Sequence, residues 1–559
     1  MADLKQYGVS GPISTDGPTP KDTELRDALI KELKGEKSFE TAEGQTRRTE
    51  VLKKFGRLTK GFVMAVGKRK GLPQSILETA GGKIFTFGSF RLGVFGPGSD
   101  IDTLMVAPRH VMRDDFFKYF PDFLRQNSGP NDIEEMVPVE EATVPIIKLE
   151  YCGVSVDLIF VSLQQASIPK DLDLTNTDLM KGLSEIDWRS VNGTRVTDRI
   201  LTLVPESRTF RIALRTIKLW AQRRAIYGNV VGFPGGVAYA MMVARVCQLF
   251  PKAEASRIVW KFFWFIKSWA WPKPLMLQRR EEGNFQQREF NPDANPGDRY
   301  ALMPIITPAY PAMNSTYNIT MSTKKVLMSE MARGETIMDN IYNGKGEWKD
   351  LFSRHAFFSQ AYKHYITIIS ASKSKEAQSA WSGLVQSRLR FLVTGIENAA
   401  PSVDIAQPYN KGFDRVFECR NEEQRDKTLQ GDLSCQIQGT ETQTTEQAGD
   451  IKVEAAAQAD AQGEPVPSTE GADGGGDEFP QKIFTTTYYV GLGLQPGKSA
   501  SHNNFPFEHR QLTIIVDAKA LNISWPIQEF KRRCTEAPPD RVNLYNENIH
   551  SIRVVHVRK

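Results

Sequence analysis

The chain has 559 residues, of which 40% are hydrophobic and 25% charged, and its formal net charge is +5. This length predicts two to four domains, and the composition is that of an ordinary soluble globular protein. The mild positive charge is compatible with a polyanionic partner but identifies none. The five cysteines show no metal-ligand spacing, which argues against structural zinc and for a reducing compartment.

The most apolar run, at residues 258–271, is interrupted by Lys261 and Lys267. It is too short to span a bilayer, and no signal peptide opens the chain, so we expect a cytosolic or nuclear protein with no membrane association. The aromatic residues crowded into this run favour a protein core over a base-stacking surface.

The N-terminal region predicts two helices and a strand. Residues 1–20 form a polar leader, rich in glycine and proline, which we expect to pack on the middle domain. Thr19 can cap, and Pro20 can begin, a helix that ends at Gly35. A second amphipathic helix has its apolar positions between residues 51 and 66, and a strand follows shortly after it. Both helices are expected to cover the sheet that this strand joins.

Residues 87–106, FGSFRLGVFGPGSDIDTLMV, combine a Gly88-Ser89 turn with two acids at the start of an apolar strand. Side chains alternate along a strand, so Asp100 and Asp102 point the same way. Two carboxylates so placed repel each other unless a cation lies between them, and a hard divalent ion such as Mg²⁺ or Mn²⁺ suits oxygen ligands. A bare Asp-x-Asp favours the alternative of two solvated acids. The glycine turn, which permits close approach of a phosphate, favours the metal site.

A third acid follows in residues 144–161, VPIIKLEYCGVSVDLIFV, which predict two strands joined at Cys152-Gly153. In the second strand Val154, Val156 and Leu158 share one face, and Asp157 lies on the other. An ionisable side chain in so apolar a strand favours a functional role, given the paired acids upstream.

The next region predicts a turn and two helices. Asn192-Gly193 has the composition of a turn. A strong amphipathic helix starts at Ser207 and is expected to end at Gly228. Its basic face carries no acid and is either solvated or bound to an anion. The Gly-Gly pair at 235–236 predicts a helix N-terminus, where free N–H groups favour anions or a purine edge. With a lysine and a tyrosine in the same stretch, these features indicate a wall that faces a nucleotide.

From residue 351 the pattern changes to strands interleaved with two helices, typical of a ferredoxin-like or RRM-like domain. We expect helices at residues 375–398 and 527–533 and strands at 362–369, 413–420, 482–494, 511–516 and 551–557. No RNP1 motif is present, so stacking of bases on the sheet is not supported.

Residues 430–480 are rich in Gln, Thr, Ala, Gly and acidic residues and contain a single lysine. Such a composition cannot bury enough apolar surface to offset the entropy of ordering, so it predicts a disordered acidic insert in the C-terminal domain. A role as an acidic decoy or as a docking segment for a partner is the alternative.

Several segments, in chain order, resemble the eukaryotic nuclear poly(A) polymerases, and in particular their fungal members, within the DNA polymerase β-type nucleotidyltransferase superfamily. They are FGSFRLGVFGPGSDIDTL, SVDLIFV, SVNGTRVTD, FRIALRTIKLWAQRRAIYGNVVGFPGGVAYAMMVARVCQLFP, WPKPL and DRYALMPIITPAYPAMNSTYNITMST. The resemblance implies an α+β multidomain fold. It would comprise a nucleotidyltransferase (polymerase β-like) palm domain at residues 21–200, a helical middle domain at 201–350, and a ferredoxin- or RRM-like RNA-binding domain at 351–559.

The resemblance also implies roles for particular residues. The catalytic metal ligands would be Asp100, Asp102 and Asp157, the first and third of which would also border the nucleotide. The residues that would line the nucleotide are Phe87, Gly88, Ser89, Ser99, Lys218, Tyr227, Asn229, Gly236 and Val237. The RNA contacts would be Lys148, Asn192 and Val144. Thr143 stands where the family usually carries an aromatic residue that stacks on a base.

The activity that the resemblance implies is template-independent transfer of AMP from ATP to RNA 3′ ends in mRNA polyadenylation, with two Mg²⁺ or Mn²⁺ ions. The implied setting is the nucleus, with a monomeric catalytic subunit that works with the cleavage and polyadenylation machinery. Two alternatives remain: an RNA nucleotidyltransferase that adds uridylyl or CCA, and a non-catalytic RNA-binding scaffold. The intact acid triad argues against the scaffold, and the appended RRM-like domain argues against the other donors.

Overall fold

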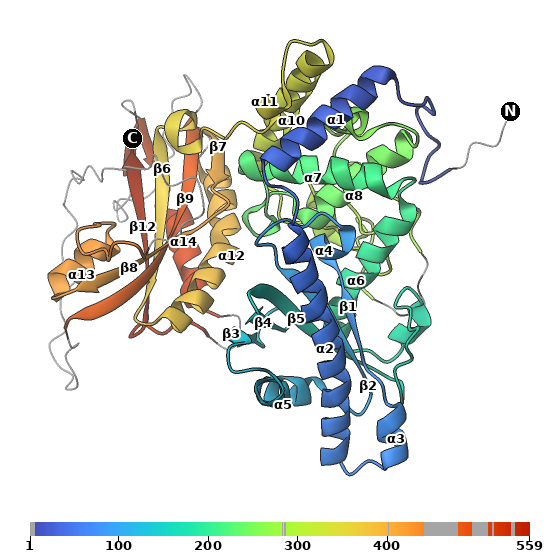
Figure 1. Ribbon diagram of the computed structural model, residues 1–559. Helices are drawn as coiled ribbons and strands as arrows, with labels where there is room; N and C mark the ends of the chain where they lie inside the picture. The colour runs from blue at the N-terminus through green and yellow to red at the C-terminus, as the bar shows by residue number, and fades with distance from the viewer. Residues whose placement is uncertain are drawn as a thin grey trace. The chain divides into compact units, whose positions relative to one another are not determined.

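The chain divides into two compact units (Figure 1). The computed structural model describes residues 6–281, 283, 285, 287–400, 402–440, 479–494, 513–516, 519–537 and 543–559. The first unit comprises Met1–Gln222, Pro234–Thr316 and Met331–Ser353, and the second comprises Arg223–Phe233, Tyr317–Glu330 and Arg354–Lys559. The domain borders expected at residues 200 and 350 stay predictions. Within the described residues, no helix is both long and apolar enough to cross a membrane.

A five-stranded mixed sheet forms the base of the first unit. Its strands are β1 (Lys83–Thr86), β2 (Ile101–Pro108), β3 (Ile133–Val139), β4 (Ile146–Tyr151) and β5 (Val154–Leu163), in the order β1-β2-β5-β4-β3. β2 and β5 run parallel, and the other neighbours are antiparallel. All the strands expected here are therefore present, and the parallel pair brings the two acid-bearing segments side by side.

The two faces of this sheet bury different side chains. On one face α2 (Ala42–Arg69) and α5 (Arg113–Gln126) pack on a core that includes Ile101, Val156 and Leu158. On the other face the strand residues Leu104 and Ile159 pack against α6 (Glu185–Leu203). Because side chains alternate along a strand, Asp102 and Asp157 lie on the α6 side. This is the alternation predicted from the sequence.

A helical layer completes the first unit. It contains α1 (Pro20–Gly35), α7 (Ser207–Arg223), α8 (Gly236–Leu249), α9 (Ala255–Ser268), part of α10 (Met321–Tyr342) and α11 (Trp348–Leu351), with the short helices α3 (Gln74–Thr79) and α4 (Gly88–Leu92) at the sheet. The N-terminal leader lies on α8. The carbonyl of Leu249 accepts from the N–H of Ile13 at 2.8 Å, and Gln248 Nε2 donates to the carbonyl of Tyr7 at 3.0 Å.

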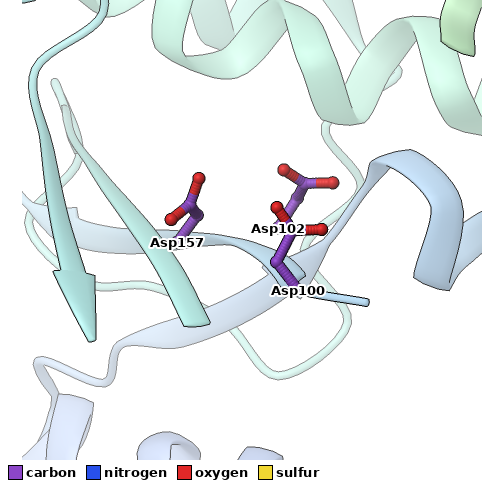
Figure 2. Close-up of side chains that lie close together, drawn as sticks. All are labelled: Asp100, Asp102 and Asp157. Carbon is purple, nitrogen blue, oxygen red and sulfur yellow. The ribbon is translucent and has the colours of Figure 1, made fainter. Parts of the chain in front are cut away.

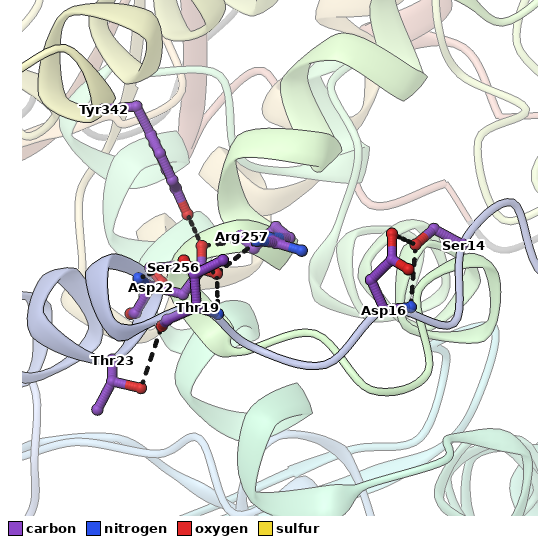
Figure 3. A network of polar contacts seen from close by, with 8 residues as sticks. All are labelled: Ser14, Asp16, Thr19, Asp22, Thr23, Ser256, Arg257 and Tyr342. Atoms are coloured by element: carbon purple, nitrogen blue, oxygen red, sulfur yellow. Dashed lines mark hydrogen bonds and ion pairs between the residues drawn. The ribbon is translucent and has the colours of Figure 1, made fainter.

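The carboxylate of Asp22 joins three helices of this layer (Figure 3). It is fully buried and belongs to the capping box of α1, where it accepts from the N–H and the hydroxyl of Thr19 at 2.7 and 2.6 Å. It also accepts from Arg257 of α9 at 2.5 Å and from the hydroxyl of Tyr342 of α10 at 3.0 Å. Burial alone would raise the pKa of Asp22, but the bonds from Thr19, Arg257 and Tyr342 lower it below its usual value. The carboxylate is therefore charged and fully paired.

We predict that Asp22→Ala destabilises the first unit by about 3–5 kcal/mol, because it leaves Arg257 without its partner in a largely buried position. The folded pKa of Asp22 is lowered, so its contribution is present above about pH 4 and is lost as the pH falls through the folded value. Urea unfolding of the wild type and the variant at neutral pH and near pH 3 measures both effects.

The control is Asp16→Asn, which changes an exposed carboxylate bonded only to Ser14 among the described residues. An unchanged midpoint for Asp22→Ala would contradict the prediction.

The second unit is built on an antiparallel sheet with the strand order of a ferredoxin-like fold. Its strands are β6 (His364–Ser372), β7 (Val403–Pro408), β8 (Phe413–Cys419), β9 (Gln481–Leu494) and β12 (His550–Arg558), in the order β12-β6-β9-β7, with β8 also paired to β9. Numbered along the chain without β8, this order is 4-1-3-2, with α12 (Lys375–Ala399) and α14 (Ser524–Thr535) as the crossovers. The RRM-like architecture expected from the sequence is thus confirmed.

Three elements of the second unit were missed, and one expectation falls outside the described residues. The sequence analysis did not include β7, α13 (Glu422–Leu429) or β11 (Lys519–Asn522), whereas the strand expected at 511–516 is present as β10 (Thr513–Val516), which pairs with β11. The predicted insert at 430–480 lies mostly in residues 441–478, which are outside the described residues.

Two predictions in the middle of the chain are wrong. Asn192-Gly193 does not form a turn, because both residues lie inside α6. Glycine is required there by packing, since a Cβ at Gly193 would lie 2.9 Å from Cδ2 of Phe87. The helix that starts at Ser207 ends at Arg223 and not at Gly228, because Ala225 has a φ of +55° and the helix cannot continue through it.

Candidate active site

Three carboxylates converge at one end of the parallel strand pair (Figure 2). Asp102 of β2 and Asp157 of β5 are direct register partners, and Asp100 precedes β2 by one residue. One oxygen from each lies within 4.8 Å of the others. Figure 2 shows all three side chains pointing to the same side of the sheet. The sequence-predicted triad is therefore assembled by strand alternation and parallel pairing.

Burial and neighbouring carboxylates raise the pKa of two members of the triad. Burial, followed by the nearby Asp100 and Asp157, raises the pKa of Asp102 to about 7, and Lys218 opposes this rise. Burial also raises the pKa of Asp157; Lys148 opposes it, and Asp100 adds to it. Such mutual repulsion is relieved when a cation is bound.

The Gly88-Ser89 turn lies directly against the triad. Gly88 has a φ of +60°, and a Cβ at this position would overlap the Asp102 carboxylate. The N–H of Phe87 donates to the carbonyl of Asp102 at 3.1 Å, and the N–H of Gly88 donates to Thr197 Oγ1 of α6 at 3.3 Å. Glycine is therefore needed here for both its backbone angle and its size. Thr197 was missed by the sequence analysis, because α6, the helix that brings it to this turn, was not expected.

One basic residue of α7, Lys218, lies at the acid triad, whereas two others, Arg211 and Arg215, stabilise a neighbouring loop. Burial, and after it Arg215, lowers the pKa of Lys218, whereas Asp100 and Asp102 raise it. Arg215 donates to the carbonyls of Phe95 at 2.8 Å and Gly93 at 3.0 Å, and Arg211 Nε donates to the carbonyl of Leu92 at 3.1 Å. These two arginines hold the loop between α4 and β2, so the basic face of α7 is not a single anion-binding surface.

The residues predicted to meet RNA surround the same edge. Lys148 of β4 is exposed and is the register partner of Asp157, and Val144 packs at the margin of the core on the α6 side. Oδ1 of Asn192 is buried without a hydrogen-bond partner among the described residues. An unpartnered acceptor beside the Gly88 turn fits a ligand hydroxyl. Ser99 is engaged locally, since its hydroxyl accepts from the N–H of Gly96 at 3.1 Å.

The remaining predicted nucleotide contacts lie in different units. Gly236 and Val237 open α8 in the first unit, where Gly235 is the N-cap and Val237 is 38% exposed. Tyr227 and Asn229 belong to the second unit. The contacts predicted for these four residues with the nucleotide stay predictions.

The donor set fits a divalent metal. Three carboxylates offer only oxygen ligands, which Mg²⁺ and Mn²⁺ prefer, and their clustering without a bound cation is unfavourable. No thiol or imidazole takes part in this cluster of described residues, which argues against zinc.

Comparison with known proteins shows matches over nearly the whole chain. The poly(A) polymerase nucleotidyltransferase domain matches residues 8–204, the poly(A) polymerase central domain matches 209–354, and the poly(A) polymerase predicted RNA binding domain matches 356–559. Poly(A) polymerase PAPalpha of Candida albicans is 45% identical over 556 residues, which cover 99% of this chain and 90% of that protein. Poly(A) polymerase pla1 of Schizosaccharomyces pombe is 44% identical over 95% of this chain and 89% of its own length.

A solved structure of the Cid1 poly(U) polymerase covers 60% of this chain and 99% of its own, at 14% identity and a TM-score of 0.39. We draw no conclusion from so weak a structural likeness. The family matches and the two near-complete relatives are sufficient: the chain belongs to the poly(A) polymerase family.

Proposed function

We propose that Asp100, Asp102 and Asp157 hold two divalent cations, Mg²⁺ or Mn²⁺, at which AMP is transferred from ATP to the 3′-hydroxyl of RNA. Membership of the family makes the chain a polynucleotide adenylyltransferase, which extends RNA without a template. The observation that carries the metal proposal is the register pairing of Asp102 with Asp157 on parallel strands, with Asp100 beside them.

Bound cations would lower the pKa of the attacking hydroxyl and stabilise the leaving pyrophosphate. The chain's own residues position the reactants. Asp157, with Lys148 beside it on β4, faces the RNA 3′ end, and the buried Oδ1 of Asn192 accepts from a ribose hydroxyl. Lys218, already next to Asp100 and Asp102, neutralises charge on the triphosphate.

The Gly88-Ser89 turn binds the phosphates of ATP in this proposal. Its φ of +60° and lack of a Cβ let the backbone approach the Asp102 carboxylate closely. Val144 completes the contacts to RNA. The contacts to the nucleotide are completed by Phe87, Ser99, Tyr227, Asn229, Gly236 and Val237. We further propose that the enzyme acts in the nucleus as a monomeric catalytic subunit of the cleavage and polyadenylation machinery.

Incubating the purified chain with 5′-labelled oligo(A) and each nucleoside triphosphate in turn tests this function. We expect extension with ATP and Mg²⁺ or Mn²⁺, much weaker extension with CTP, GTP or UTP, and none after EDTA treatment. Preferred use of UTP, or addition that ends after CCA, would support a different donor. Binding of oligo(A) without any extension would support the scaffold.

A further inference from the structure

Three guanidinium groups surround one phenyl ring on the helical face of the second unit. The ring of Phe391, in α12, has the Cζ atoms of Arg388, Arg390 and Arg533 at 6.0, 4.7 and 4.5 Å from its centroid. Arg388 and Arg390 lie on α12, and Arg533 lies in the last turn of α14. The two helices lie side by side against the sheet (Figure 1). We call these four residues the Phe391 cluster.

The charges of the Phe391 cluster are poorly balanced. Arg533 Nε donates to Glu529 at 2.7 Å, but Glu529 is shared with Arg532. Among the residues that the structure describes, Arg390 bonds only to the neutral side chain of Asn318. Within the described residues, the side chain of Arg388 makes no hydrogen bond or ion pair, and its Nε is buried without a partner, as is that of Arg390. Burial, together with Arg388 and Arg533, lowers the pKa of Arg390. Among the described residues, Arg533 is thus the one cation of the cluster that is paired with a carboxylate, and it shares that carboxylate with Arg532.

Cation–π contact with Phe391 explains why each guanidinium group lies near the ring, but it does not explain why three such groups lie together. Each cation–π contact is favourable, yet every added guanidinium repels the others, so one ring offsets little of the accumulated charge. An anion that bridges the three groups removes this repulsion, and planar guanidinium groups match phosphate oxygens in pairs.

An exposed aromatic ring next to the Phe391 cluster, and a second one on α14, favour a nucleic acid over an isolated anion. Tyr317, which is 59% exposed, lies close enough to Arg390 to affect its pKa, and Trp525, which is 63% exposed, begins the first turn of α14. Single-stranded RNA binds to surfaces that pair basic groups with aromatic rings and arginine planes, on which its bases stack.

We propose that the Phe391 cluster binds the phosphate backbone of the RNA primer, that Tyr317 offers a stacking position beside it and that Trp525 offers another at the opposite end of α14. The proposal rests on the proposed function in that RNA is the ligand, and it assigns to the second unit a primer contact in addition to the acid triad of the first. It does not depend on the metal assignment, because binding is measured without catalysis.

The test is binding of 5′-fluorescein oligo(A) to the full chain by anisotropy, without divalent cations, over a series of salt concentrations. We expect Arg388→Gln/Arg533→Gln to weaken binding about tenfold near 0.1 M salt and to reduce the slope of log K against log salt by about 0.7 for each phosphate that is no longer neutralised. The charge-matched control is Arg425→Gln/Lys427→Gln on α13, where both cations are already ion-paired. The control should keep the wild-type slope.

A second variant and a kinetic measurement distinguish a loss of RNA binding from a loss of folding. Arg388→Lys/Arg533→Lys keeps the charge and should retain more affinity than the glutamine pair, and circular dichroism melting shows that each variant folds. In extension assays the loss should fall on the KM for the primer more than on kcat. Wild-type affinity and slope in the glutamine pair, or an equal loss in the control, would overturn the proposal. A glutamine pair that binds RNA normally but no longer binds a synthetic peptide of residues 441–478 would assign the cluster to an acidic peptide instead.

A chain that binds the primer through the Phe391 cluster but does not catalyse adenylyl transfer would give a different result. The wild-type chain would then bind oligo(A) with the predicted salt slope but would not extend it with any nucleotide.

Discussion

Asp102→Asn is expected to reduce AMP incorporation by at least about 1000-fold while leaving a folded protein, because it removes the central carboxylate of the cation site. The same change should raise the melting temperature measured in EDTA. Burial and two neighbouring carboxylates raise the pKa of Asp102 to about 7, so its charged form is disfavoured in the fold and the neutral amide relieves that repulsion.

Differential scanning fluorimetry with and without Mg²⁺ or Mn²⁺ separates the metal role from a structural one. The wild type should be stabilised by either cation, and Asp102→Asn should respond much less. Asp171→Asn, at an exposed carboxylate away from the triad, is the control and should match the wild type. Undiminished extension by Asp102→Asn, or its loss of folding in EDTA, would refute the assignment.

Gly88→Ala is the second change with a large expected effect. The added methyl group would overlap the Asp102 carboxylate and force it away from Asp100 and Asp157, so we expect extension to fall by about 100-fold or more. The backbone at residue 88 is left-handed, with a φ of +60°, which adds roughly 1 kcal/mol of strain for alanine.

Gly98→Ala isolates the overlap from the backbone strain. Gly98 has a φ of +71°, but a Cβ there would meet nothing within 4 Å. The two variants should therefore lose similar stability in urea unfolding, while only Gly88→Ala loses activity and cation-dependent stabilisation. Equal activity in the two would show that the close approach of residue 88 to Asp102 has no catalytic importance.

Much of the candidate site could be predicted from the sequence because its geometry is local. Strand periodicity alone places Asp100 and Asp102 on one side of β2 and Asp157 on the side of β5 away from Val156. That the two strands are parallel neighbours, with Asp102 opposite Asp157, is not local; the expectation of convergence came from the resemblance to the family. The cap at Thr19 and the end of α1 at Gly35 followed from the composition of the helix ends.

The failures share a physical cause, which is tertiary contact overriding local preference. Asn-Gly is a strong turn signal, yet residues 192–193 stay helical because α6 must pack closely on Phe87. The arginines of α7 had the spacing of an anion-binding face, but Arg211 and Arg215 are bound to carbonyls of a loop more than a hundred residues earlier. No window of sequence contains both partners of such a bond.

The pairing of β8 with β9 has a consequence for the evolution and engineering of the chain. Cys419 and Gln481 are register partners, so the connection between these strands leaves and re-enters the sheet at adjacent positions. When the ends of a connection are fixed together, doubling its length adds only about 0.6 kcal/mol of closure entropy. Relatives can thus gain or lose residues here at little thermodynamic expense, and a fluorescent reporter inserted between residues 441 and 478 would leave the strand order of the sheet unchanged.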